Sequence, residues 1–134
     1  MIKGIHHAAL SVLDLERAVR YFTTGTGFVI ERRWRLAALG DEDSAVLLRG
    51  PNGFVELQRH SSPDSRVPAD RPVCAAGITH LCFQHQSMDE LVAGFSRGGA
   101  TLHAEPVALG TGYLYCYIRD AETNVLELEG NPVA

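Results

Sequence analysis

Apolar residues recur with helical spacing in two stretches of the chain. Both stretches follow the i, i+3, i+4, i+7 pattern, which places four side chains on one face of a helix and so predicts two amphipathic helices. The positions are Leu15, Ala18, Val19 and Phe22 in the first stretch, and Met88, Leu91, Val92 and Phe95 in the second. Asp14 and Ser87 precede these stretches as suitable N-caps, and Ser87 with Glu90 predicts a capping box.

Shorter apolar segments bounded by turn residues predict eight strands around these helices. The predicted strands are 5–12, 29–36, 45–49 and 53–59 in the first half of the chain, and 78–85, 101–107, 113–119 and 124–129 in the second half. Each half is therefore expected to run strand, helix, strand, strand, strand.

The two halves also share short motifs at matching positions. The motif at 4–7 returns at 77–80, so that His80 is the counterpart of His7, and the motif at 54–57 returns at 125–128, so that Glu127 is the counterpart of Glu56. We infer a duplicated βαβββ unit, with module one at about 1–60, a linker at about 61–74 and module two at about 75–134. One such unit is too small to fold alone, which predicts a single domain over 1–134.

Strand alternation places one histidine and one glutamate of each copy on the face away from its helix. These residues are His7 and Glu56 in the first copy, and His80 and Glu127 in the second. If the two sheets curve toward each other, this face becomes a shared cavity. A cation there would offset the unfavourable burial of two carboxylates. Two nitrogen and two oxygen ligands, with open positions for water, make a five- or six-coordinate centre that suits Mn, Fe, Co, Ni or Mg. Zn is also possible, although it more often takes four ligands in total.

Composition narrows the possible partners. The chain has 134 residues, of which 46% are hydrophobic and 21% charged, as in an ordinary globular domain. A net charge of −4 argues against nucleic acid as a partner. No apolar run is long enough to cross a membrane, and the N-terminus does not resemble a secretory signal. We read the three cysteines, Cys74, Cys82 and Cys116, as reduced and buried thiols of a cytoplasmic protein.

These motifs together resemble the vicinal oxygen chelate superfamily, which includes glyoxalase I, methylmalonyl-CoA epimerase, extradiol dioxygenases, and bleomycin and fosfomycin resistance proteins. The resemblance covers nearly the whole chain and is carried by the segments 5–18, 21–28, 54–57, 77–80 and 120–128. Ala121 and Thr123 replace a proline and a glycine of the family's usual turn before Glu127, while Asn124 is kept. The resemblance implies an α+β fold, in which two tandem βαβββ modules with curved mixed sheets form a half-open barrel around a metal site.

The resemblance further implies that His7, Glu56, His80 and Glu127 bind a divalent metal, with His6 as a competing candidate for the first ligand. A carboxylate at Glu56 favours the glyoxalase and epimerase branches, because dioxygenases and fosfomycin-type enzymes are expected to use two histidines and one glutamate. The implied activity is that of a lyase or isomerase, in which the metal stabilises an enediolate from a small substrate with vicinal oxygens. Glu56 or Glu127 would then be the catalytic base.

Several interpretations stay open at this point. An extradiol-type dioxygenase and a non-catalytic binding protein of the antibiotic-resistance type are the alternative functions, and the family is typically homodimeric. Tyr113, Tyr115 and Tyr117 alternate along one strand and would line either an aromatic-tolerant cavity or an outer face. The arginines around Trp34, at positions 32, 33 and 35, predict a charged strand edge or, alternatively, an anion clamp for the substrate.

Overall fold

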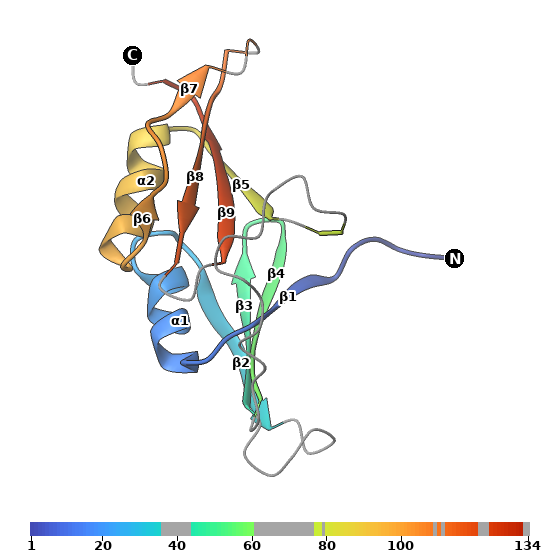
Figure 1. Ribbon diagram of the computed structural model, residues 1–134. Coiled ribbons are helices and arrows are strands. Elements are labelled where there is room, and N and C mark those ends of the chain that lie inside the picture. The colour runs from blue at the N-terminus through green and yellow to red at the C-terminus, as the bar shows by residue number, and fades with distance from the viewer. Residues whose placement is uncertain are drawn as a thin grey trace. The chain divides into compact units, whose positions relative to one another are not determined.

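The computed structural model describes residues 1–35, 44–60, 77–78, 80–108, 110, 112–120 and 124–132. Contacts divide the chain into a first unit, Met1–Asp64, and a second unit, Ser65–Ala134 (Figure 1). Each unit pairs one long helix with one mixed sheet, and both have the same order of strands in space. The α+β class and the two βαβββ modules are therefore confirmed. The half-open barrel, and the single domain over residues 1–134, stay predictions.

The first unit places four strands in the order β1-β4-β3-β2. Its elements along the chain are β1 (His7–Ser11), α1 (Leu15–Thr23), β2 (Val29–Arg35), β3 (Ser44–Gly50) and β4 (Gly53–Arg59). β1 runs parallel to β4, whereas the β2–β3 and β3–β4 pairs are antiparallel. The helix α1 packs against β3 and β4, so that one face of the sheet is covered within this unit.

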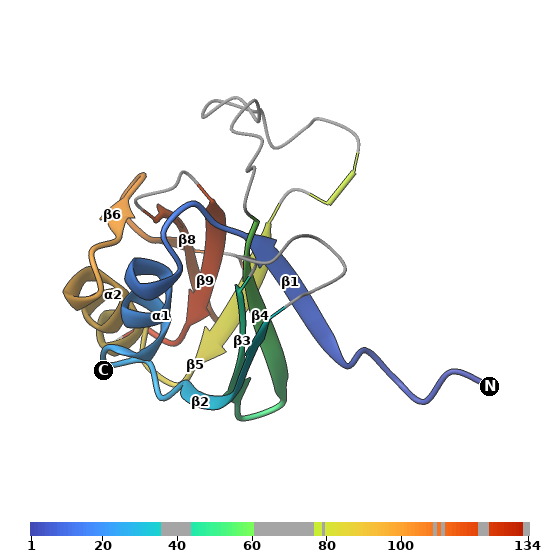
Figure 2. The same cartoon turned by 90° about the horizontal axis from the view of Figure 1, so that it is seen from below.

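The second unit repeats this arrangement in the order β5-β9-β8-β6, with β7 also paired to β8. Its elements are β5 (Leu81–His85) and α2 (Met88–Arg97) (Figure 2), followed by β6 (Thr101–Leu102), β7 (Val107–Ala108), β8 (Leu114–Arg119) and β9 (Val125–Gly130). β5 is parallel to β9, and β8 is antiparallel to β9. The equivalent parallel pairing of first and last strand in both units supports the duplication inferred from sequence.

Both helices begin where the caps predict. The Asp14 side chain accepts a hydrogen bond from the Arg17 backbone N–H at 2.9 Å, and the Ser87 hydroxyl accepts one from the Glu90 N–H at 3.3 Å. The apolar face of α1 is buried against its sheet, and Phe22 is fully buried. Phe95, at the matching position of α2, is fully buried as well.

The capping box predicted at Ser87 forms only in part. The Ser87 hydroxyl caps the helix, but the Ser87 N–H donates to Nδ1 of His85 at 3.0 Å, not to the Glu90 carboxylate. The His85 imidazole, two residues before the N-cap, accepts the hydrogen bond from the Ser87 N–H that a full capping box would give to the Glu90 carboxylate. Glu90 remains exposed, with a carboxylate oxygen 3.9 Å from His85 Nδ1.

The strand predicted over 101–107 is wrong as one element. It divides into β6 and β7, and residues 103–106 lie between them. Pro106 has no backbone N–H to give to a ladder, which explains an interruption at this point. The strand predicted from residue 5 begins only at His7, because β1 pairs with β4 from Phe54 onward and the turn at 51–52 leaves earlier residues without a partner strand. Ile5 is accordingly 92% exposed.

One prediction about the cysteines also needs correction. Cys116 is buried as expected, but Cys82 is exposed, because it lies on the face of β5 opposite to the residues that pack on α2. Both are free thiols, and Cys74 lies outside the described residues. Among the residues that the structure describes, neither helix has the length or the apolar character needed to cross a bilayer.

Candidate metal centre

Each unit brings one histidine and one glutamate together at the same place in its sheet. In the first unit His7 lies opposite Phe54 across the parallel β1–β4 pair, so Glu56, two residues further along β4, lies diagonally ahead on the same face. In the second unit the β5–β9 pair has the same register, with Leu81 opposite Leu126. Residues two apart on a strand share a face, which explains why both pairs form on the side away from the helix.

The first pair, His7 and Glu56, has hydrogen-bonding neighbours. His7 Nε2 lies 3.4 Å from Glu56 Oε2, and the Glu56 side chain is only 9% exposed. The Gln58 amide donates a hydrogen bond to the other oxygen, Oε1 of Glu56. On the far side of the imidazole, His7 Nδ1 lies 2.8 Å from Nδ1 of His6. The His6 ring is in turn stacked on Phe54, with centroids 5.1 Å apart.

The second pair is tighter and has an aromatic neighbour. His80 Nε2 lies 2.7 Å from Glu127 Oε2, and the Glu127 side chain is 18% exposed. Tyr117 lies opposite Glu127 in the β8–β9 ladder and presents its ring edge-on to His80, with centroids 5.4 Å apart. Burial raises the pKa of the Tyr117 hydroxyl, and the negative charge of Glu127 adds to that effect. The phenol therefore stays protonated near neutral pH.

The spacing within each pair fits two ligands of one cation. Metal–nitrogen and metal–oxygen bonds are about 2.0–2.2 Å long, so two donors at right angles around a metal lie about 3 Å apart. The observed separations of 3.4 Å and 2.7 Å fall on either side of this value. In both pairs the facing atoms are imidazole Nε2 and a carboxylate oxygen, which are ordinary ligands of divalent transition metals.

Among the residues that the structure describes, neither unit holds a complete ligand set by itself. Within the described ranges, no group of three or more His, Cys, Asp or Glu side chains comes together in a way that could hold a metal. Each pair supplies two donors, which is half of the four-ligand set expected from sequence. The competing ligand, His6, contacts the outer nitrogen of His7, so its role differs from that of His7.

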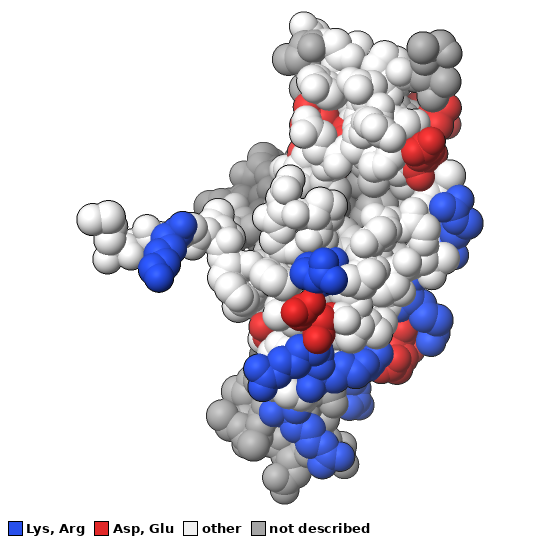
Figure 3. Space-filling view, turned by 180° about the vertical axis from the view of Figure 1, so that it is seen from behind, with Lys and Arg blue, Asp and Glu red and all other residues white. Residues whose placement is uncertain are grey.

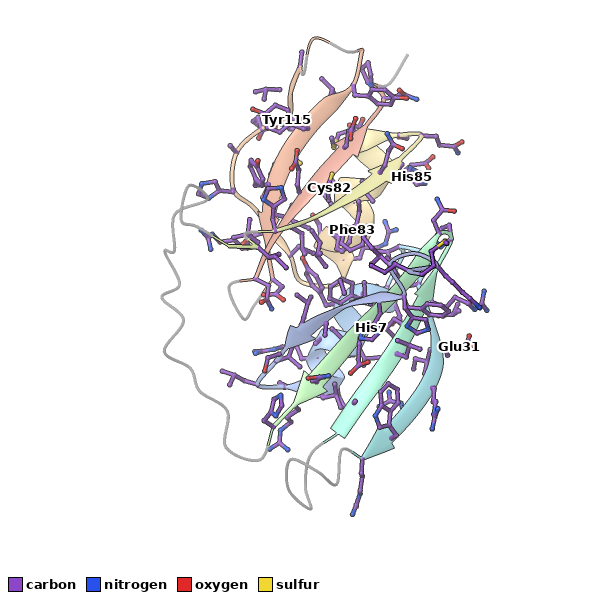
Figure 4. The ribbon with its side chains drawn as sticks, turned by 90° about the vertical axis from the view of Figure 1, so that its right-hand side faces the viewer. His7, Glu31, Cys82, Phe83, His85 and Tyr115 are labelled. Carbon is purple, nitrogen blue, oxygen red and sulfur yellow. The ribbon has the colours of Figure 1, made fainter. Side chains whose placement is uncertain are left out.

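Other polar residues share the face of the second pair. Cys82 lies on β5 (Figure 4), opposite Glu127 of β9, and Gln84 lies opposite Glu129 in the same pair. Partial burial raises the pKa of the Cys82 thiol to about 11, and the charges of Glu127 and Glu129 contribute to the shift. Strand alternation in the sequence places His80, Cys82 and Gln84 on one face, and the register of β5 with β9 agrees with this placement for Cys82 and Gln84.

The tyrosines divide between two environments. Tyr115 and Tyr117 lie on the same face as Glu129 and Glu127, with their rings 6.0 Å apart, whereas Tyr113 precedes β8. The two strand tyrosines therefore belong to the face that carries the His80–Glu127 pair. This placement favours the interpretation in which they line the site.

Two of the three arginines around Trp34, Arg32 and Arg33, have contacts on the edge strand β2. Arg33 forms a two-contact ion pair with Glu16 of α1, and Arg49 pairs with Glu31 at 2.9 Å. Figure 3 shows Lys and Arg side chains next to Asp and Glu side chains on one side of the molecule. Arg32 instead lies over the ring of Trp34, 5.4 Å from its centroid. The ion pair between the edge strand β2 and α1 explains Arg33, so an anion clamp is not required for it.

Comparison with known proteins gives consistent results. A family model described as the Glyoxalase/Bleomycin resistance protein/Dioxygenase superfamily matches residues 4–128. An uncharacterised Bacillus subtilis protein, YwkD, is 30% identical over 131 residues, which cover 96% of this chain and 97% of that protein. The crystal structure of a glyoxalase family protein from Bacillus cereus has a TM-score of 0.79 and 26% identity, and covers 99% of this chain and 97% of that one.

A more distant structure shares the fold. It is a mutant of the genomically encoded fosfomycin resistance protein FosX from Listeria monocytogenes, solved with Mn(II) and 1S,2S-dihydroxypropylphosphonic acid. Its TM-score is 0.67 at 16% identity, with 98% of this chain and 94% of that one covered.

Proposed function

The chain belongs to the Glyoxalase/Bleomycin resistance protein/Dioxygenase superfamily, and we propose that it is a metal-dependent lyase or isomerase of the glyoxalase and epimerase type. The observation that carries the proposal is the pairing, in each unit, of an imidazole Nε2 with a carboxylate oxygen: His7 with Glu56, and His80 with Glu127. Together these residues would hold one divalent cation, which is Mn, Fe, Co, Ni, Mg or Zn. Each unit then contributes half of the site, and this explains why duplication preserves both pairs.

When bound, the metal would supply Lewis-acid stabilisation of negative charge on an oxygen of the substrate. The proposed substrate is a small molecule with neighbouring oxygens and an acidic C–H bond beside a carbonyl. A carboxylate of this chain, Glu56 or Glu127, removes the proton from that carbon and returns it at a new position. Tyr117, a protonated phenol close to Glu127, is placed to donate a hydrogen bond during the transfer.

The surroundings of the two glutamates favour different roles. Glu56 is tethered at Oε1 by Gln58 and is the more buried of the two. Glu127 is paired with His80 through Oε2 and its side chain is more exposed than that of Glu56. A carboxylate that must leave the metal to accept a proton needs freedom to move, and this condition favours Glu127 as the base, with Glu56 as a fixed ligand.

The FosX neighbour was solved with Mn(II) and a small dihydroxy acid, which is consistent with a divalent metal and a compact oxygenated substrate in this fold. The family also supports a homodimer as the assembly, and we propose this state for a cytoplasmic protein. Light scattering on the purified chain checks it, because a monomer has a mass of 14.6 kDa and a dimer twice that mass.

Elemental analysis of full-length protein prepared without chelators tests the metal. We expect close to one divalent ion per site in the wild type and a loss of bound metal in His7→Ala and in Glu127→Ala. His60→Ala, which removes an imidazole outside the two pairs, is the matched control and should keep its metal. A wild-type protein without affinity for any of these ions would contradict the proposal.

Two results would favour the other functions. Oxygen consumption with a catechol, tolerance of Glu56→Gln and dependence on Fe(II) or Mn(II) would indicate a dioxygenase. Metal-independent binding of a small molecule, unchanged in His80→Ala, would indicate a non-catalytic binder. The carboxylate of Glu56, buried against His7, is the observation that favours the lyase or isomerase over both.

A further inference from the structure

We propose that His6 and Gln58 are positioning residues, which orient the ligand atoms of His7 and Glu56 through hydrogen bonds to the atoms that face away from the metal. The inference rests on the proposed function, because it assumes that His7 and Glu56 bind a cation. It goes further in assigning roles to two residues of the first unit that are not themselves ligands.

The contact between the two histidines is compatible with the tautomer of His7 that metal binding requires. Their Nδ1 atoms lie 2.8 Å apart, so one of the two carries the hydrogen and the other accepts it. If Nε2 of His7 is to present its lone pair to a metal, the ring proton of the neutral imidazole must be on Nδ1. His7 then donates from Nδ1 to His6, which accepts with its own Nδ1.

The His6 ring is itself held in place. It stacks on Phe54 with centroids 5.1 Å apart and an angle of 20° between the ring planes. Phe54 lies opposite His7 in the β1–β4 pair and two residues before Glu56. The strand that carries one ligand therefore also supports the residue that orients the other ligand.

Gln58 acts on the carboxylate in an equivalent way. Its amide donates to Oε1 of Glu56, which leaves Oε2 as the oxygen 3.4 Å from His7 Nε2. Gln58 is two residues after Glu56 on β4, so the strand period places both on one face. The two outer hydrogen bonds thus engage Nδ1 and Oε1, and the inner atoms Nε2 and Oε2 face each other.

The second unit lacks these groups at the matching positions of the repeat. The residue that follows Glu127 at the spacing of Gln58 from Glu56 is Glu129, which has no amide donor. The residue just before His80, in the place of His6 before His7, is Thr79, which has no ring nitrogen. Outer hydrogen bonds to metal ligands commonly contribute about 10–100-fold to metal affinity. We therefore expect such a contribution at the first pair from His6 and Gln58.

The experiment measures Mn(II) affinity of the full-length chain by calorimetry or chelator competition. His6→Phe keeps a ring to stack on Phe54 but removes Nδ1, and should weaken binding about 10–100-fold. His6→Asn places Oδ1 the same number of bonds from Cα as Nδ1 and should restore most of the affinity. Gln58→Leu, which removes the amide donor, should weaken binding by a similar factor.

Controls separate positioning from folding. His60→Phe should bind Mn(II) like the wild type, and the metal-free variants should match the wild type in circular dichroism and in urea unfolding. Wild-type affinity in both His6→Phe and Gln58→Leu would overturn the inference while leaving the proposed function intact. Equal weakening in His6→Phe and His6→Asn would overturn the hydrogen-bonding role of His6. A wild-type chain that binds no divalent ion would remove the proposed function together with this inference.

Discussion

The first unit surrounds its His7–Glu56 pair with hydrogen-bonding neighbours, whereas the second unit leaves His80 and Glu127 in direct contact at 2.7 Å beside an aromatic ring. The scaffolds behind the two pairs are alike in strand order, in the parallel pairing of first and last strand, and in the helix that covers one face. The duplicated parts are those that place a histidine and a glutamate diagonally on one face. The residues next to the two pairs differ. For this reason the carboxylates of Glu56 and Glu127 also differ in how freely they can move.

This contrast indicates which features the fold itself requires. The alternation of apolar and polar side chains along each strand, and the buried apolar face of each helix, must be kept in both units, because losing them would expose the core. A glutamine or a tyrosine beside the pair is not required for folding and can differ between units. The asymmetry at the site is therefore better explained by function than by stability.

The largest expected effect compares the two cores. Phe22 and Phe95 occupy matching positions of α1 and α2, and both are fully buried. Phe22→Ala and Phe95→Ala should each lower the free energy of unfolding by about 3–5 kcal/mol, since each leaves a cavity the size of a benzyl group. Urea unfolding of the full chain measures both. A loss below about 1 kcal/mol in one variant alone would show that the two helices are not equivalent supports.

Most of the scaffold could be predicted because its signals are local. Both helices follow from a four-residue apolar pattern with a polar cap in front, and β4 begins and ends where the turn residues indicate. Two of the wrong predictions are each explained by a single residue. Pro106 interrupts the strand expected over 101–107, and His85 takes the N–H that was expected to bind Glu90.

For the site, the sequence predicts only which side chains share a face, because this is what the two-residue period of a strand determines. Alternation places His7 with Glu56, and His80 with Glu127, on the correct faces. It does not reveal which atoms meet, because that depends on the register between strands and on side-chain rotamers. For this reason the contacts made by Gln58 and Tyr117 appear only in the structure.

The helix caps give a smaller and sharper comparison. Asp14→Ala and Ser87→Ala should each destabilise the chain by about 1 kcal/mol, because each removes the acceptor for one backbone N–H. His85→Ala, as a separate substitution, should lower the free energy of unfolding by about 0.5–1.5 kcal/mol, because the Ser87 N–H then loses its acceptor. Val12 stands at the matching position of the first unit and cannot accept a hydrogen bond through its side chain.

These cap effects are measured as changes in the urea unfolding midpoint, with Glu90→Ala as the control. Glu90 is exposed, and its N–H bond to Ser87 is a backbone contact that survives the substitution. A larger loss in Glu90→Ala than in His85→Ala would indicate that the Glu90 carboxylate accepts the Ser87 N–H, and would remove this difference between the helices.

The last prediction concerns pH and tests a buried thiol of the second unit, which contains every cysteine of the chain. Burial raises the pKa of the Cys116 thiol to about 11, with Glu105 and Glu127 adding to the shift. A thiol in the unfolded chain titrates near about 8.5, so its contribution to stability is complete below that pH and is lost as the pH rises toward about 11. Between about pH 8 and pH 10, under reducing conditions, the wild type should therefore lose more unfolding free energy than Cys116→Ala.

The alanine variant starts from a lower stability at both pH values, so the comparison depends on the two slopes of unfolding free energy against pH. Equal slopes would mean that Cys116 titrates alike in the folded and unfolded chains, and that its burial leaves its proton affinity unchanged.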